Sequence, residues 1–150
     1  MTAPSTASTS PPIPPTAFAV AERVRWEDVD LVGIVRYSAY TRLMDVAESE
    51  LFRAAGLAHP ALLERFGVWL VRRVLHLEYH APARFDELLQ LRIWPGRVGR
   101  TSLTLHVAVL DERGATRHAT GSFVLVAVGA EGWEAVEVPG GVTEALRRFG

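Results

Sequence analysis

The sequence predicts an α+β fold, in which an antiparallel sheet packs on one long helix. The order of the expected elements supports this class, because one strand pattern comes first, a single long helical pattern follows, and the rest of the chain is mostly strands. The first strand is expected at residues 18–26, the helix at 38–55, and the later strands at 69–80, 87–94, 101–110 and 116–128. Consecutive strands joined by short turns pair antiparallel, and one helix can cover a face of their sheet.

The long helix is predicted by apolar residues at helical spacing and by a signal at each end. Ser38 can cap its first turn, and Gly56 can adopt the left-handed conformation that ends a helix. A shorter helix is expected at residues 59–66, and a last helical turn near residues 142–149. The apolar positions of the long helix are Tyr40, Leu43, Met44, Ala47, Leu51 and Ala54.

The strands are predicted by a period of two. This alternation is clearest at Leu103, Leu105, Val107 and Val109, which alternate with polar or small residues. Residues 111–114, between the last two strands, have the composition of a hairpin turn.

The composition predicts one globular domain, at residues 17–150, since 49% of the 150 residues are hydrophobic and 22% are charged. Residues 1–16, rich in proline, serine and threonine, are expected to form a disordered tail. Sixteen basic and seventeen acidic residues give a net charge of −1, which argues against nucleic acid or an anionic membrane as a partner.

The absence of cysteine excludes disulfides, thiolate metal sites and a cysteine nucleophile, and it favours a cytoplasmic location. No export signal or membrane-spanning stretch is expected, because the longest apolar run covers only residues 123–128. The chain also lacks the glycine-rich and serine-containing motifs of nucleotide-binding proteins and serine hydrolases.

An acidic loop at residues 27–33 precedes the long helix and contains Asp28 and Asp30. One of its carboxylates could attack a carbonyl carbon or activate water, while the free amides of the helix start polarise the carbonyl oxygen. Acidic residues before a helix also stabilise its dipole without any chemical role. From the residues alone, both interpretations stay open.

Two other clusters have a functional and a plain interpretation. His76, Glu78 and His80 share one strand face and could bind zinc, but a solvated face opposite buried Leu75, Leu77 and Tyr79 is favoured. A basic turn at residues 97–102 could contact phosphates or could simply be solvated.

The segment RWEDVDLVGIVRYSAYTRLMDVAESELF, residues 25–52, resembles the signature of the 4-hydroxybenzoyl-CoA thioesterase-like hotdog family. Residues 77–87 and 97–103 are similar to further family segments, and the resemblance covers about residues 18–138. It implies a hotdog fold, with about five antiparallel strands wrapped around the helix. It also implies homodimers joined edge to edge, often paired into homotetramers, and neither a metal nor an organic cofactor.

The resemblance also implies roles for single residues. Asp30 corresponds to the catalytic carboxylate, and the backbone amide of Tyr37 would polarise the thioester carbonyl. Because several family members have histidine at the position of Tyr37, only its backbone role is carried over. Gly33 belongs to the substrate-binding loop, and Asp45 would contact the acyl group or support the loop.

The family further implies that Arg100, and with it Arg97, binds the phosphates of CoA across a subunit boundary, while the acyl group enters beside the helix near Asp45 and Glu48. The function expected from it is hydrolysis of a small or medium acyl-CoA. The alternative is a hotdog protein that binds acyl-CoA or acyl carrier protein without catalysis. A dehydratase is disfavoured, because no histidine lies between Asp28 and Leu57.

Overall fold

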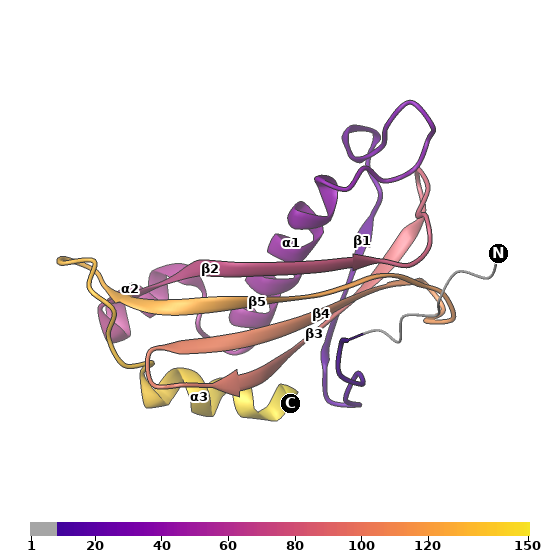
Figure 1. Ribbon diagram of the computed structural model, residues 1–150. Coiled ribbons are helices and arrows are strands. Elements are labelled where there is room, and N and C mark those ends of the chain that lie inside the picture. The colour runs from indigo at the N-terminus through magenta and orange to yellow at the C-terminus, as the bar shows by residue number, and fades with distance from the viewer. Residues whose placement is uncertain (1–8) are drawn as a thin grey trace.

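The computed structural model describes residues 9–150 and confirms the predicted α+β architecture. One antiparallel sheet has the strand order β1-β3-β4-β5-β2 and lies against the long helix α1 (Figure 1). The strands are β1 (Phe18–Arg23), β2 (Val68–Tyr79), β3 (Leu88–Val98), β4 (Ser102–Asp111) and β5 (Arg117–Gly129). The helices are α1 (Ala39–Ala54), α2 (His59–Phe66) and α3 (Gly140–Leu146), with short 3₁₀ turns at Trp26–Asp28 and Arg147–Phe149.

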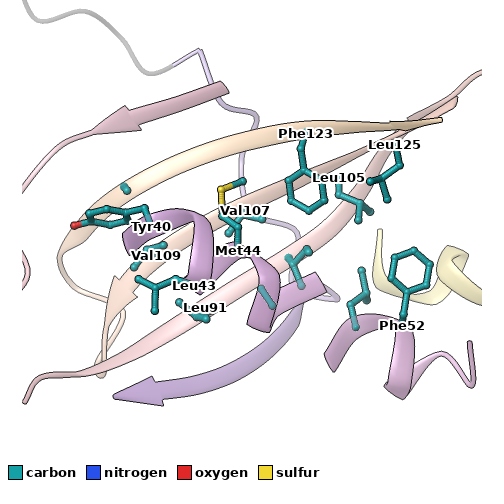
Figure 2. Close-up of a cluster of buried hydrophobic side chains, with 14 of the residues drawn as sticks. Tyr40, Leu43, Met44, Phe52, Leu91, Leu105, Val107, Val109, Phe123 and Leu125 are labelled. Carbon is teal, nitrogen blue, oxygen red and sulfur yellow. The ribbon is translucent and has the colours of Figure 1, made fainter. Parts of the chain in front are cut away.

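The main core lies between α1 and the concave face of the sheet (Figure 2). Of the six positions predicted for the helix, Tyr40, Leu43, Met44, Ala47 and Leu51 are buried, whereas Ala54 in the last turn is exposed. Every second residue of β4, from Leu103 to Val109, meets them from the sheet. The helical spacing in α1 and the alternation in β4 therefore mark the two surfaces that pack together.

The two predicted ends of α1 have different outcomes. Gly56, with φ of +74°, ends the helix: its amide donates to Arg53 O at 3.0 Å, and the Leu57 amide donates to Phe52 O at 2.7 Å. This is a Schellman motif. The predicted cap at Ser38 is wrong in its chemistry, because the Ser38 side chain makes no capping hydrogen bond. Thr41 instead donates its hydroxyl to Ser38 O at 2.7 Å.

Strand boundaries differ from the prediction at two places. The first strand ends at Arg23 instead of residue 26, because the chain turns into the 3₁₀ segment at Trp26. Strand β3 continues to Val98, four residues beyond its predicted end, through an irregularity between Pro95 and Val98. The hairpin turn at residues 111–114 is confirmed by a bond from Gly114 N to Asp111 O.

Strand β2 forms one edge of the sheet and pairs only with β5 among the described strands. Leu75 and Tyr79 were predicted to be buried, but they are 49% and 51% exposed. The reason is topological, because an edge strand has no neighbour on its outer side to cover its side chains. Val74 is also half-exposed, so both faces of this edge expose apolar side chains beside the charged Arg72 and Arg73.

Of the predicted tail, residues 1–8 lie outside the described part of the chain. Ile13 packs against Ala17 and Trp94 on the outer face of the sheet, and Arg92 donates to Ala17 O at 3.2 Å. The ordered contacts of the domain therefore begin before residue 17. Within residues 9–150, none of the helices has the length and apolar character needed to cross a bilayer.

Candidate active site

The loop between β1 and α1 holds Asp30 in a tight turn. The Gly33 amide donates to Asp30 O, and the Asp30 amide donates to Ile34 O, both at 3.0 Å. Gly33 has φ of +83°, a conformation that favours glycine, so its place in the turn has a steric reason. The Asp30 carboxylate accepts a hydrogen bond from Val32 N at 2.9 Å, and no cation among residues 9–150 forms an ion pair with it.

Asp28, the other acid of the loop, is buried and paired. Its Oδ1 accepts from Arg42 Nε at 2.8 Å, and its Oδ2 accepts from the Arg25 amide at 2.8 Å and from a second Arg42 nitrogen. Burial alone would raise the pKa of Asp28, but the bonds from Arg42 and Arg25 outweigh it and hold that pKa below its usual value. Asp28 therefore attaches the loop to α1, a pairing that no local sequence pattern predicted.

Asp30 and Tyr37 line the same groove, which we call the helix groove because it opens at the start of α1. Its volume is about 630 Å³. The amide of Tyr37, one of its lining residues, has no backbone acceptor among residues 9–150 and so keeps its capacity to donate a hydrogen bond. The residues that line it are Asp30, Ile34, Val35, Arg36, Tyr37, Tyr40, Tyr79, His80, Ala81 and Pro82.

Two tyrosines of the helix groove were missed as site residues by the sequence reasoning. Tyr79, at the end of β2, donates its hydroxyl to Tyr37 O at 3.3 Å, and its ring meets that of Tyr40 edge to face, with the ring centres 5.2 Å apart. Burial raises the pKa of Tyr40 to about 12, so its hydroxyl stays protonated. Tyr79 lies in the family segment at residues 77–87, and that membership was the available signal.

A second groove, which we call the aromatic groove, lies on the other side of Asp30. Its volume is about 620 Å³, and it shares Asp30 and Arg36 with the helix groove. Trp26 and Phe85 meet edge to face in it, with their ring centres 5.3 Å apart. Its lining residues are Trp26, Val29, Asp30, Leu31, Val32, Gly33, Arg36 and Phe85, so the predicted substrate-binding Gly33 borders this groove.

Asp45 and Glu48 lie farther along α1 and share one partner, Arg72 of β2. Arg72 pairs with the exposed carboxylate of Asp45 and, at 2.5 Å, with the buried carboxylate of Glu48. Burial raises the pKa of Glu48, although the guanidinium of Arg72 opposes that shift. The expected contact of Asp45 with an acyl group stays a prediction, because its partner in this structure is Arg72.

Arg97 and Arg100 lie far from Asp30 within one chain. They belong to the hairpin turn at the end of β3, whereas the Asp30 loop is attached just before β3 begins, through Val35 N to Ala83 O at 2.8 Å. The eleven residues of β3 separate the two ends by roughly 30 Å at about 3.3 Å per residue. A single chain therefore does not bring these arginines to Asp30 (Figure 1).

The candidate zinc residues are engaged with different partners. His76 Nε2 lies 3.0 Å from Glu78 Oε1, whereas His80 Nε2 bonds with Thr120 Oγ1 at 2.8 Å. In the described part of the chain, no group of three or more histidine, aspartate or glutamate side chains is arranged to hold a metal ion.

Comparisons with known proteins place the chain among thioesterases. The sequence model of the thioesterase-like superfamily matches residues 24–146. The acyl-CoA thioester hydrolase YbgC of Escherichia coli O6:H1 is 32% identical over 96 residues, which are 64% of this chain and 71% of that protein. A thioesterase superfamily structure from Jannaschia sp. CCS1 has a TM-score of 0.82 at 22% identity and covers 91% of this chain and 95% of its own. A 1,4-dihydroxy-2-naphthoyl-CoA thioesterase from Synechocystis has a TM-score of 0.79 at 14% identity, covering 87% and 96%.

Proposed function

The chain belongs to the thioesterase-like superfamily and is a thioester hydrolase with the hotdog fold, and we propose that it hydrolyses an acyl-CoA to the free acid and CoA. The observation that supports the proposal is the helix groove, which is lined by both Asp30 and Tyr37, whose amide has no backbone acceptor among residues 9–150. The acyl-CoA thioester hydrolase among its relatives supports the choice of substrate.

In this proposal Asp30 supplies the reacting carboxylate and the Tyr37 amide polarises the thioester carbonyl. Asp30 either attacks the carbonyl carbon, so that the carbon–sulfur bond breaks and a mixed anhydride forms for water to hydrolyse, or takes a proton from a water that attacks directly. Both routes release CoA as a thiol and return Asp30 as a carboxylate. Its exposure and its lack of a described cationic partner suit either role.

We propose that Arg97 and Arg100 bind the CoA phosphates of a site on the neighbouring subunit. Neither guanidinium has an acidic partner among residues 9–150. If two copies pair antiparallel along their β2 edges, the end of β2 near Tyr79 in one copy meets the end near Val68 in the other. The arginine hairpin of one copy then lies at the same end of the dimer as Asp30 of its neighbour. A homodimer, alone or doubled into a homotetramer, is therefore the proposed active form.

The test is replacement of Asp30 by Asn, with thiol release measured over a panel of aliphatic and aromatic acyl-CoAs. We expect the wild type to turn over at least one of them and Asp30→Asn to be at least about a hundredfold slower, with an unchanged circular dichroism spectrum. The control is Glu27→Gln in the same loop, since its side chain is 66% exposed and lines neither groove. Activity of Asp30→Asn equal to that of Glu27→Gln would remove Asp30 from the mechanism. Tight acyl-CoA binding without thiol release by the wild type would contradict the proposed hydrolysis.

A further inference from the structure

The loop at residues 81–87, between β2 and β3, supports both the helix groove and the segment that carries Asp30. Two of its residues line the helix groove. Its Ala83 O accepts a hydrogen bond from the Val35 amide at 2.8 Å, and an adjacent β-bridge joins the same two segments. The place of Asp30 therefore depends on the conformation of residues 81–87.

His118, at the start of β5, lies between the two ends of this loop. Its side chain is only 5% exposed. Its Nδ1 lies 3.3 Å from Ala81 O, and its Nε2 lies 3.6 Å from Glu87 Oε2. Because a carbonyl oxygen can only accept a hydrogen bond, the contact with Ala81 requires the proton of the ring to be on Nδ1. The imidazole thus contacts the first and the last residue of the loop.

The main chain of β5 also binds the start of this connection. His118 O accepts hydrogen bonds from the amides of His80, at 2.9 Å, and of Ala81, at 3.3 Å. The ring of His80 bonds in turn with Thr120 Oγ1 at 2.8 Å. Any residue at position 118 would supply the same backbone oxygen. The contribution that belongs to histidine is therefore the pair of ring contacts, which joins the two ends of the loop.

We propose that His118 is a positioning residue for the thioesterase reaction, because it holds the ends of the 81–87 loop together and thereby fixes the place of Asp30. The inference rests on the proposed function, since it takes Asp30 as the reacting carboxylate. His118 acts through the loop and is not among the residues that line the helix groove.

The burial of His118 argues against a plain core position. Its Nε2 is buried and has no hydrogen-bond partner within residues 9–150. A buried nitrogen without a partner is destabilising, and an apolar side chain at this position would avoid that cost. A role for the ring in holding the loop gives a reason for histidine at this position.

The experiment compares His118→Leu with His118→Asn. Leucine has no donor, whereas the side-chain amide of asparagine can donate to Ala81 O in place of Nδ1. For the acyl-CoA that the wild type hydrolyses fastest, we expect kcat to fall about ten- to a hundredfold in His118→Leu with little change in KM, since a small displacement of a reacting group has effects of this size. His118→Asn should recover most of that loss.

Hydrogen exchange measured by NMR gives a second readout that needs no turnover. The Val35 amide should exchange about tenfold or more faster in His118→Leu than in the wild type, because its acceptor loop is held less firmly, and His118→Asn should restore the slow rate. The matched control is Val142→Ala, since Val142 is also buried but belongs to α3, which lies beside the Pro95 end of β3. It should lower the stability of the fold and leave kcat and Val35 exchange unchanged.

Equal kcat and equal Val35 exchange in His118→Leu and Val142→Ala would overturn the proposal, as would a His118→Asn variant as impaired as His118→Leu. If His118→Leu does not fold, Glu87→Ala removes the other ring contact from a side chain that is 37% exposed. Unchanged kcat and exchange in Glu87→Ala would then overturn the proposal. A failure of the proposed function looks different, since the wild type would release no thiol from any acyl-CoA while the exchange rates would still respond to His118.

Discussion

The two aspartates of the loop before α1 have opposite surroundings, which suit a structural role for Asp28 and the proposed chemical role for Asp30. Asp28 is 2% exposed and receives hydrogen bonds from Arg42 and Arg25, whereas Asp30 is exposed and accepts one bond from its own turn. A carboxylate neutralised by a guanidinium is a poor nucleophile or base. Asp28 therefore keeps the loop in place, and Asp30 remains available to react.

Replacement of Asp28 by Asn should destabilise the protein by roughly 1–3 kcal/mol at neutral pH, because Arg42 loses its buried partner and keeps only Glu22. Urea unfolding followed by circular dichroism measures the change. Glu27→Gln, in the same loop but exposed, is the control and should have little effect. Comparable losses for the two variants would show that the Asp28–Arg42 pair does not hold the loop.

The stabilisation from Asp28 should depend on pH in a defined direction. Because folding lowers the pKa of Asp28, its contribution is fully present above the unfolded value of about 3.9 and is lost as the pH falls through the folded value. Unfolding free energies of the wild type and Asp28→Asn should thus converge below about pH 3.9. A difference that stays constant from neutral pH down to the acid limit would contradict this account.

For single residues, the sequence predicted where a side chain lies in the fold better than which side chain it pairs with. Asp30 and Tyr37 were both expected at the helix start, and the structure brings them to one groove, although their catalytic roles remain proposals. The pairs Asp28–Arg42 and Asp45–Arg72 join residues 14 and 27 positions apart. No local pattern encodes such pairs, because they depend on how α1 lies against the loop and against β2.

Among the elements, β2 stands out because one of its edges has no partner strand in the described chain and its apolar side chains are half-exposed. It is an edge strand of twelve residues with Val74 and Leu75 half-exposed on its two faces, and its ladder is irregular between Arg72 and Val74. Long apolar edges attract another strand unless charges or proline block them. In the proposed dimer, a second copy of β2 would pair with the free backbone groups of this edge and cover its apolar side chains.

The double variant Val74→Asp/Leu75→Asp should therefore be monomeric, because pairing of two β2 edges would bury charged carboxylates where apolar side chains now stand. Sedimentation velocity measures the oligomeric state, and circular dichroism confirms that the fold persists. The matched control is Ala19→Asp/Ala21→Asp on β1, the other edge of the sheet, where both alanines are exposed. A monomeric control, or a dimeric β2 variant, would assign the interface elsewhere.

Most element boundaries, apart from the ends of β1 and β3, were predictable because alternation, turn residues and helical spacing are local. The position of β2 at an edge was not, because strand order depends on pairings between distant segments. The error on Leu75 and Tyr79 followed from this, since an alternating strand was assumed to bury one face against neighbours on both sides. The extension of β3 past Pro95 was equally hidden, as proline normally argues against a continuing strand.

For the whole molecule, the residues of the proposed site are divided between the two ends of one chain. Asp30 lies at one end of the sheet and the arginine hairpin at the other, and the β2 edge offers the pairing that brings them together between two copies. A test of this arrangement must distinguish residues that act within one chain from residues that act between chains. Mixing two defective variants makes this distinction.

Asp30→Asn and the double variant Arg97→Ala/Arg100→Ala should each have low kcat/KM for an acyl-CoA, for different reasons. If sites form between copies, a mixed dimer has one site with both Asp30 and the two arginines and one site with neither. Random exchange makes half of the dimers mixed, so an equal mixture should recover about a quarter of the wild-type kcat/KM.

Mass spectrometry of the intact dimer verifies that the subunits have exchanged. If the activity after exchange stays at the average of the two variants, the arginines and Asp30 have separate functions. Because neither variant has both Asp30 and the two arginines, recovery on mixing would mean that the dimer, and not the single chain, is the catalytic unit.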